Sequence, residues 1–391
     1  MFRRTLKLAL PGAIALIALT ATAATARPAA APAHPHLLLV PADAPTIQAA
    51  VDRAHGGDTV VVDPGIYTEE VVVTKDLTLR GAGVDKTVIK APTTLTPYAV
   101  HLPTGRSLTA IVRVAGNVHV NISRLTVRGP IPCGIEVSGV HALQGATLEL
   151  TDARVTGIQA DAATCSADQA AGRAVVYGTP VHIAVDGVEG TTAFGHVSNV
   201  RVDHYQHAGI SVAGPVSGAP SRVTIDHDAV EGGWTIPTSQ VGLWVEDGGV
   251  VHADHNVIAG NRCGGDGCGG DPMSEIQGIG VFLLAVPAGS VVADNLVAGN
   301  DVGINPLASP DCCAITRNVV VGQRYFGIVI PDGNGTTDGN WISDVPTGIA
   351  VVADFEDTTG VLRHDHITRT SDAPVRELSC CGVTAHAVVI R

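Results

Sequence analysis

A six-residue pattern recurs along the chain and constrains the fold more than any other feature. Each copy has an apolar residue, a variable residue, two turn-prone polar residues, another variable residue and a second apolar residue. The clearest copies are Ile225–Val230, Ala253–Ile258, Val292–Val297, Ile315–Val320, Thr337–Ile342 and Leu362–Ile367, with weaker copies at Ile122–Val127, Leu150–Val155 and Val197–Val202. Such internal repetition predicts a solenoid, in which each repeat packs on its neighbours.

The fourth position of six consecutive copies is always Asn or Asp. The residues at this position are Asp228, Asn256, Asn295, Asn318, Asn340 and Asp365. Both residue types tolerate left-handed backbone geometry and bond to nearby backbone groups. We therefore expect a stacked ladder of these side chains that holds a tight turn between two strands.

A glycine followed by alternating apolar residues comes after each copy of the pattern. The segments are Gly134–Val137, Gly209–Val212, Gly242–Val245, Gly278–Val281, Gly303–Ile304, Gly327–Ile330 and Gly348–Val351. The glycines from Gly278 onwards are 25, 24 and 21 residues apart, which is the length of a coil with three strands. Hydrophobic residues make up 45% of the chain and aromatic residues only 3%, which favours many short strands.

The N-terminal part of the repeat region predicts a cap. Ile47, Ala50, Val51 and Ala54 have helical spacing within residues 46–54, and a helix there would cover the open end of the solenoid. The segment TIQAAVDRAHGGDTVVVDPGIYTEEVVVTKDLTLRGAG, residues 46–83, resembles the entry of the right-handed parallel β-helix superfamily. This superfamily includes pectate lyases, pectin methylesterases and periplasmic β-helix repeat proteins. The resemblance implies one all-β domain over residues 37–391, and it specifies no activity.

The first 26 residues are typical of an export signal. Arg3, Arg4 and Lys7 precede the apolar run Leu8–Leu19, and Ala24–Ala26 offers a small-residue cleavage site. Residues 27–36 are expected to be a flexible linker. We expect a secreted monomer without membrane insertion. Removal of the signal leaves a net charge of about −16, which excludes nucleic acid as a partner and requires a local Arg patch or bound cations if the ligand is a polyanion.

Eight cysteines in an exported chain favour disulfides over metal sites. Cys133 and Cys165 fall in loops of neighbouring coils, whose spacing of about 4.8 Å suits a disulfide. Cys263 and Cys268 lie in one glycine-rich insertion and can close a small loop. The adjacent pairs Cys312–Cys313 and Cys380–Cys381 are left open as vicinal disulfides or free thiols.

The outer face of the glycine-led strands is the predicted ligand groove, because long insertions enter these strands. With Leu243 and Val245 turned inward, alternation turns Trp244 and Glu246 outward. A Trp beside a carboxylate suits stacking on a sugar ring and bonding to its hydroxyls, whereas the alternative is a Trp packed beneath an insertion. The neighbouring insertion contributes Trp234, and Asp247 and Asn305 complete this part of the predicted substrate-binding set.

Two neighbouring loops supply candidate catalytic and metal-binding groups. His204, Tyr205 and His207 precede Gly209 and can supply an acid, a base and a hydroxyl binder near neutral pH, or form an ordinary polar connection. The insertion 259–277 contains Asp266, Asp271 and Glu275, whose carboxylates either hold calcium or form a solvated acidic loop. His227, His255 and His364 share one turn position and are interpreted as ladder neighbours.

Further along, Arg324 and Tyr325 enter the strand at Gly327, and Asp332 follows it. An arginine acts as the base in pectate lyases, so the resemblance implies Arg324 as a base. Tyr325 and Asp332, beside the same strand, are predicted substrate-binding residues. The segment Pro64–Glu69 resembles the first motif of pectin methylesterases, but the paired catalytic aspartates of that family are not found. The motifs of polygalacturonases and alginate epimerases are likewise absent from the sequence.

Two functions from different classes remain. One is an extracellular lyase or glycoside hydrolase that works on a polysaccharide around Trp244, with His204, His207, Glu246 and Arg324 as the catalytic candidates. The other is a noncatalytic β-helix that binds a cell-envelope glycan or a protein, for which an aromatic-rimmed surface is enough. Calcium is the only cofactor that the sequence brings into consideration.

Overall fold

The computed structural model describes residues 35–160, 165, 171–233, 239–309 and 312–391. The predicted signal segment and Trp234 therefore lie outside the described residues. Pro35–Arg391 forms one unit by its own contacts. It is an all-β solenoid in which each coil contributes one strand to each of three rows.

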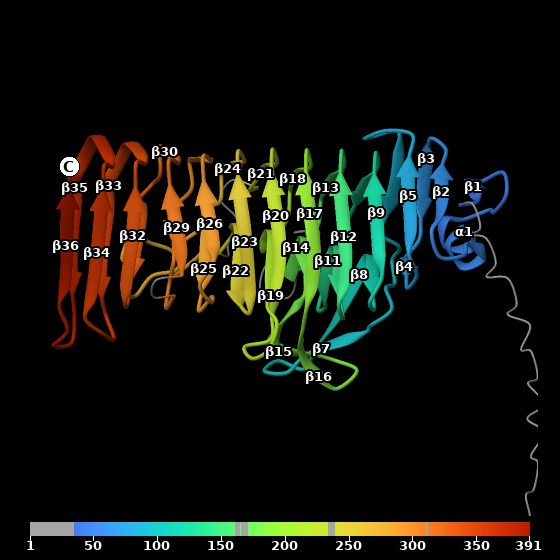
Figure 1. Cartoon of the computed structure of the whole chain (residues 1–391), viewed down its shortest axis with the longest axis horizontal. Coiled ribbons are helices and arrows are strands. Elements are labelled where there is room, and N and C mark those ends of the chain that lie inside the picture. The colour runs from blue at the N-terminus through green and yellow to red at the C-terminus, as the bar shows by residue number, and fades with distance from the viewer. Residues whose placement is uncertain (1–34, 161–164, 166–170, 234–238, 310–311) are drawn as a thin grey trace, which may run out of the picture. The chain divides into compact units, whose positions relative to one another are not determined.

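The strands of the first row stack in parallel and follow the order of the chain from β1 to β36 (Figure 1). They are the front row of arrows in Figure 1, from blue to red. Their bounds are β1 Leu37–Val40, β2 Asp58–Val62, β5 Leu77–Gly81, β9 His119–Ser123, β12 Ala146–Thr151, β17 Ala193–Ser198, β20 Ser221–Asp226, β23 Gly249–Asp254, β26 Ser290–Ala293, β29 Cys313–Thr316, β32 Asn334–Asp338, β34 Thr358–Arg363 and β36 Ala385–Ile390.

The second row contains shorter strands that follow the first turn of each coil. Their bounds are β3 Gly65–Thr68, β6 Thr87–Lys90, β10 Thr126–Arg128, β13 Arg154–Thr156, β18 Arg201–Asp203, β21 Ala229–Glu231, β24 Val257–Ala259, β27 Leu296–Ala298 and β30 Val319–Val321. The row continues into the first residues of β33 Trp341–Ala353 and β35 His366–Ser379.

The third row follows the second turn and carries the glycine-led segments. Its strands are β4 Val71–Val73, β8 Arg106–Ala115, β11 Glu136–Leu143, β14 Ala171–Tyr177, β19 Ala208–Gly214, β22 Val241–Asp247, β25 Ile279–Leu284, β28 Val302–Asn305 and β31 Phe326–Pro331, continued by the last parts of β33 and β35. Because β33 and β35 run through both rows, the second and third rows share one 23-stranded sheet.

Three strands leave the solenoid and pair in antiparallel fashion. β7 Ala99–His101 pairs with the start of β8 and with β15 Thr179–Val185, which also pairs with β16 Val188–Thr191. Figure 1 shows these strands projecting below the middle coils. This small sheet, which we call the side sheet, lies next to the third row because β7 continues into β8 through a tight turn.

A short helix, α1 Ile47–Arg53, covers the β1 end of the solenoid. The Thr46 hydroxyl caps its N-terminus by accepting a hydrogen bond from the Ala49 N–H at 3.1 Å. Ile47, Ala50 and Val51 are buried in the core cluster. The predicted all-β parallel β-helix with an N-terminal capping helix is confirmed. Of the helices in the described part of the chain, none has the length and apolar character needed to cross a membrane.

The interior is filled by ladders of aliphatic side chains in register. Ile258, Val297, Val320 and Ile342 stack on one another from β24 to β33, and each is at most 1% exposed. Close coil packing also explains the glycines of the third row: a Cβ on Gly303 would lie 2.3 Å from the Gly327 carbonyl oxygen.

The glycine register differs from the predicted one at two coils. Gly139, not Gly134, stacks with Ala174 and Gly209, since Val140 pairs with Val175 and Val175 with Ile210. Gly280, not Gly278, stacks between Gly242 and Gly303, since Ile279 pairs with Val241 and with Val302. Gly278 lies in the preceding turn, where a Cβ would come within 2.5 Å of the Arg262 backbone. The insertion before it shifts the alignment by two residues.

The predicted ladder of Asn and Asp side chains is present, and it is buried from Asp228 to Asn340, with its last member Asp365 half-buried. Asn295 shows the pattern: its Nδ2 donates to Asn318 Oδ1 at 3.0 Å, and its backbone N–H donates to the same oxygen at 3.1 Å. The left-handed residue of the turn is the preceding one, such as His255 with φ 56° or Arg317 with φ 55°. The ladder residues therefore bond between coils, and the residue before each one makes the turn.

A second amide ladder lies at the turn between the second and third rows. Asn261 Nδ2 donates to Asn300 Oδ1 at 2.8 Å, and Asn300 Nδ2 donates to Gln323 Oε1 at 3.1 Å. The glycine before each residue has a positive φ of 64–73°. The sequence signal for this ladder is the repeated dipeptide Gly-Asn or Gly-Gln at 260, 299 and 322, which the six-residue pattern does not include.

All eight cysteines are paired in the structure. Cys133 is bonded to Cys165, and Cys263 to Cys268, each pair with Cα atoms 5.6 Å apart. Cys312–Cys313 and Cys380–Cys381 form vicinal disulfides. The first bridge joins loops that are 32 residues apart, and the other three are local.

The N-terminal end of the first ladder gives a prediction about stability. Burial raises the pKa of Asp228 to about 8, although the Val200 N–H bonds to its Oδ1, and its Oδ2 is buried without a partner among the described residues. An unfolded Asp has a pKa near 3.9. The stability that the protonated Asp228 side chain contributes to the folded state is therefore complete below about pH 4 and is lost as the pH rises through about 8.

We expect Asp228→Asn to increase the free energy of unfolding at pH 8 by on the order of 1–3 kcal/mol, because a neutral amide avoids the cost of a buried charge. At pH 4 the gain should be much smaller. Urea denaturation at the two pH values measures both. An equal change in the free energy of unfolding at pH 4 and pH 8 would contradict a raised pKa for Asp228.

Candidate functional site

One row of side chains crosses the outer face of the third strand row. Strand pairing aligns these residues across neighbouring coils in the order Arg113, His141, Val176, Ser211, Trp244, Phe282 and Asn305. Leu243 and Val245, on either side of Trp244, are buried in the core, so the predicted alternation holds. We call this set the outer row.

Four polar atoms in the outer row are buried without a hydrogen-bond partner among the described residues. They are Arg113 Nε, Ser211 Oγ, Trp244 Nε1 and Asn305 Oδ1. Buried polar groups in native proteins are almost always bonded to protein, water or ligand. The row therefore concentrates unsatisfied donors and acceptors along a line parallel to the solenoid axis, and strand spacing of about 4.8 Å places its ends roughly 29 Å apart.

Trp244 is half-buried and in contact with three neighbouring side chains. Its ring centre lies 4.8 Å from that of His207 and 5.7 Å from that of Phe282. The Arg173 guanidinium lies 5.0 Å from the ring centre, a cation–π distance. The indole face is therefore covered by Arg173, and a sugar can stack on it only if this arginine moves.

Arg173 also pairs with the predicted catalytic residue Glu246. Its Nη1 lies 3.2 Å from Glu246 Oε1, and the two side chains are only 18% and 4% exposed. Burial, together with the positive charge of Arg173, lowers the pKa of His207 to about 3. His207 is thus neutral at physiological pH, and its role as an acid or base stays a prediction.

A second group of polar side chains lies at the other end of the outer row, beneath the side sheet. The Tyr98 hydroxyl is 2.5 Å from His141 Nδ1, and His141 Nε2 is 3.0 Å from the Gly178 carbonyl oxygen. A carbonyl only accepts, so Nε2 carries the proton and Nδ1 accepts from Tyr98. Burial, assisted by Arg173 and Arg113, lowers the pKa of His141 to about 4, which keeps the ring neutral.

Arg113 completes this group. Its guanidinium lies 4.7 Å from the centre of the Tyr98 ring. Burial raises the pKa of Tyr98, although Arg113 and the Ser138 hydroxyl oppose the change, so Tyr98 stays protonated. A pocket between β11, β14 and β15 is lined by His141, Arg173 and neighbouring residues, and its volume of about 20 Å³ leaves room for roughly one water molecule.

The side sheet covers this group and is tied to the predicted groove through Asp247. Asp247 has a left-handed φ of 52°, and its Oδ2 accepts a hydrogen bond from the Val181 N–H at 3.1 Å. At the rim, the His101 and His182 rings meet edge to face at 5.0 Å. Asp247 therefore positions the covering strand β15 rather than standing open to a ligand.

The remaining predicted histidine and tyrosine lie away from Trp244. His204 is the left-handed residue of its turn, with φ 53°, and its exposed ring bonds to Asp203 Oδ1 at 2.9 Å. Tyr205 is fully buried in the core, where its hydroxyl donates to Asn261 Oδ1. Tyr205 is not available to a surface ligand, because the turn at His204 directs the next side chain inward.

Arg324, Tyr325 and Asp332 form contacts of their own. Arg324 Nη1 lies 3.7 Å from Asp301 Oδ1, and its guanidinium is 4.9 Å from the Tyr325 ring centre. Asp332 Oδ1 accepts from the backbone N–H groups of Asp354 and Phe355, both at 2.9 Å. Asp332 thus shapes a turn, and the contacts found for Arg324 in the described chain do not include Trp244.

The predicted calcium ligands are engaged in a local turn. Asp271 accepts from the Ser274 hydroxyl at 2.6 Å and from the Met273 N–H at 3.0 Å, and these bonds lower its pKa. The Asp271 N–H donates to Glu275 Oε2 at 2.7 Å. Asp266 is exposed. Within the described residues, Asp266, Asp271 and Glu275 do not form a close group of ligand atoms.

Sequence reasoning missed Tyr98, Arg113, His141 and Arg173. His141 lies in the apolar segment Glu136–Leu143, and Arg173 follows the stretch where the repeat spacing is lost. The one available signal was polar residues at outward positions of an otherwise apolar strand. Their convergence depends on β7 and β15, which pair antiparallel and have no counterpart in the repeat.

No protein-family model and no curated protein sequence matches the chain. Among solved structures, a polygalacturonase from Erwinia carotovora ssp. carotovora is 12% identical, with a TM-score of 0.49 over 93% of this chain and 99% of the other. The A-module of a mannuronan C-5 epimerase from Azotobacter vinelandii is 12% identical, with a TM-score of 0.45 over 88% and 94%.

An alginate lyase from Paenibacillus sp. str. FPU-7 is 14% identical, with a TM-score of 0.42 over 86% of this chain and 96% of the other. At these identities and TM-scores the similarity identifies neither a family nor an activity. It leaves the activity to be argued from the site itself.

The buried pair of Arg173 and Glu246 gives a prediction. Arg173→Met leaves Glu246 buried without its partner, so we expect a loss of about 3 kcal/mol in the free energy of unfolding. The double variant Arg173→Met/Glu246→Leu should recover much of this loss. Urea denaturation of the two variants measures the difference.

The matched control is Arg369→Met, which breaks the exposed pair with Asp344 and should hardly change the denaturation midpoint. If the double variant is as unstable as the single one, the loss comes from packing on Trp244 and not from the stranded carboxylate.

Proposed function

We propose that this chain is an exported protein that binds a linear polysaccharide along the outer row. The observation that carries the proposal is the alignment of Arg113 Nε, Ser211 Oγ, Trp244 Nε1 and Asn305 Oδ1, all buried and unpartnered in the described chain, in one register row. A glycan presents hydroxyls at regular intervals, so it can supply donors and acceptors along such a line.

The charges at the β8 end favour a carboxylate-bearing glycan. Arg113 offers an unpartnered donor there, and Arg173 stands two strands further on. The net charge of −13 repels a polyanion in general, and these arginines provide the local positive charge that a polyanionic ligand requires. Guanidinium groups also match carboxylate geometry.

Binding requires local movement, because the four atoms are buried in the unliganded arrangement. Arg173 covers the Trp244 ring, and its two partners, the ring and Glu246, hold it there. A carboxylate or hydroxyl from the ligand can replace Glu246 as the partner of Arg173. Withdrawal of Arg173 from the ring would then open the aromatic face for stacking.

Cleavage of the bound glycan by β-elimination is the second candidate function, favoured by the group around Tyr98. This reaction takes a proton from the carbon next to a carboxylate, forms a carbon–carbon double bond and expels the glycosidic oxygen, which receives a proton. His141 Nδ1 is an acceptor, Tyr98 is a protonated donor and Arg113 is a cation for the carboxylate.

The test of binding uses one variant that removes an unpartnered atom without changing charge and one that also removes a positive charge. We expect Asn305→Leu to weaken polysaccharide binding about two- to tenfold, since one hydrogen bond is lost. The free energy of unfolding should stay equal or rise, because a buried unsatisfied atom is removed. Arg113→Met should weaken binding of a uronate polymer roughly tenfold or more, since a charge-assisted bond is lost.

The matched control is Thr368→Val, which removes a buried unpartnered hydroxyl from the second strand row. Calorimetry against a panel of neutral and uronate polysaccharides measures the affinities. The binding proposal fails if no glycan in the panel binds, or if Asn305→Leu and Arg113→Met bind as tightly as Thr368→Val does.

Cleavage is tested separately by the ultraviolet absorbance of unsaturated products. We expect Tyr98→Phe to abolish product formation while the affinity stays within about twofold, because the phenol oxygen acts in the reaction more than in binding. If the wild-type chain binds a polysaccharide but forms no unsaturated product, the lyase function is rejected and the binding function is kept.

A further inference from the structure

Two histidines and an aspartate meet at the capped end of the solenoid. Asp58 begins β2 and is only 4% exposed at its side chain. Its Oδ1 accepts from the His36 backbone N–H, and its Oδ2 accepts from the His55 backbone N–H, both at 2.8 Å. His36 precedes β1 and His55 follows α1, so one carboxylate joins three segments of the cap.

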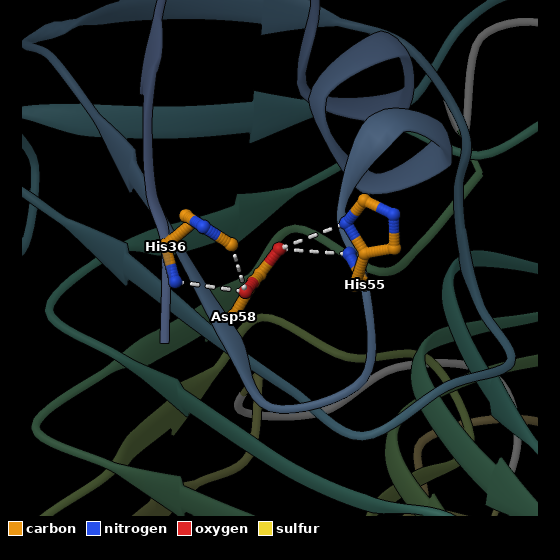
Figure 2. Close-up of side chains that lie close together, drawn as sticks. All are labelled: His36, His55 and Asp58. Atoms are coloured by element: carbon orange, nitrogen blue, oxygen red, sulfur yellow. Dashed lines mark hydrogen bonds and ion pairs between the residues drawn. The ribbon is translucent and has the colours of Figure 1, made fainter. Parts of the chain in front are cut away.

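The imidazoles of the same two histidines flank this carboxylate, as Figure 2 shows. His36 Nδ1 lies 3.5 Å from Asp58 Oδ1, and His55 Nδ1 lies 3.7 Å from Asp58 Oδ2. The three potential ligand atoms all lie within 4.8 Å of one another. The two backbone bonds fix the carboxylate and both histidine Cα atoms relative to each other.

The Asp58 carboxylate has acceptor capacity to spare. Each oxygen accepts one backbone hydrogen bond and has a second lone pair. The imidazole Nδ1 atoms of His36 and His55 are the nearby groups that these oxygens can share with a cation.

The dimensions suit a small divalent cation. In a tetrahedral zinc site with bonds of about 2.1 Å, ligand atoms lie about 3.4 Å apart. The carboxylate–imidazole distances are already close to this value. The imidazoles are 70% and 85% exposed, so they are free to rotate over the remaining distance, at most about 1.4 Å.

We propose that His36, His55 and Asp58 form a zinc site that fastens the N-terminal cap. Two imidazoles and a carboxylate are zinc ligands, and water takes the fourth position. The ion joins the residue before β1 to the loop after α1 and to the first residue of β2. It stabilises the end of the solenoid, which has no preceding coil in the described chain to pack against.

The other close group of potential ligands does not compete in this role. It contains Asp354, Cys380 and Cys381. Its two sulfurs are joined in the vicinal disulfide, so neither is a thiolate ligand. Among the described residues, the cap therefore holds the cluster with available ligand atoms.

The test is a calorimetric titration of zinc chloride into the full chain, prepared without a histidine tag and stripped of metal with a chelator. We expect one zinc ion per chain at the cap and a rise in Tm on zinc addition. His36→Gln and His55→Gln should each weaken this binding at least tenfold and abolish the rise in Tm. Both variants keep the backbone N–H bonds to Asp58, so the cap should still fold.

The matched control is His252→Gln, which removes an exposed histidine beside Asp254 on the first strand row. It should bind zinc as the wild-type chain does. The proposal is overturned if zinc does not bind, or if His36→Gln and His55→Gln bind it as tightly as His252→Gln. In that case the three residues act only as a charge-assisted clamp.

Discussion

Buried amide side chains bond each coil to the next, and the rest of the structure depends on this contact. Asn256, Asn295, Asn318 and Asn340 each donate from Nδ2 to the oxygen of the next ladder residue and also bond to a backbone carbonyl. An amide offers donors and an acceptor, so a stack of amides satisfies itself indefinitely. The ladder fixes the register of the strands on both sides of the turn.

A fixed register has a consequence for the outer face. Side chains at equivalent positions line up along the axis. The polar atoms that single coils contribute therefore fall in one row, as those of Arg113, Ser211, Trp244 and Asn305 do. In a globular fold such residues would be scattered. The solenoid therefore turns spacing in the sequence into a linear surface, which suits a polymeric ligand more than a small molecule.

The parts of the fold that repeat could be predicted from the sequence. Each ladder Asn has the same surroundings in every coil, so an Asn at the fourth position of the six-residue pattern predicts a side chain that stacks on the next coil. Alternation likewise placed Leu243 inside and Trp244 outside. The alignment failed at Gly134, whose register position Gly139 takes, and at Gly278, because an insertion precedes it. It also failed at Tyr205, because the turn at His204 resets the alternation.

The site could not be predicted in the same way, because it depends on segments outside the repeat. Tyr98 contacts His141 because the neighbouring strand β7 turns back and pairs with β8 and β15. Arg173 covers Trp244 from two strands away, a contact that no local pattern encodes. Alternation predicts that the Trp244 side chain points out of the core, but it does not predict whether that side chain is exposed to solvent, since Arg173 covers the indole.

The most direct measurement is a high-resolution crystal structure of the chain with a bound oligosaccharide. Ligand binding along the outer row predicts a sugar chain parallel to the solenoid axis, with hydrogen bonds to Ser211 Oγ, Trp244 Nε1 and Asn305 Oδ1 and with Arg173 moved off the indole. An oligosaccharide bound on another strand row, with ordered waters bonded to those three atoms, would contradict it.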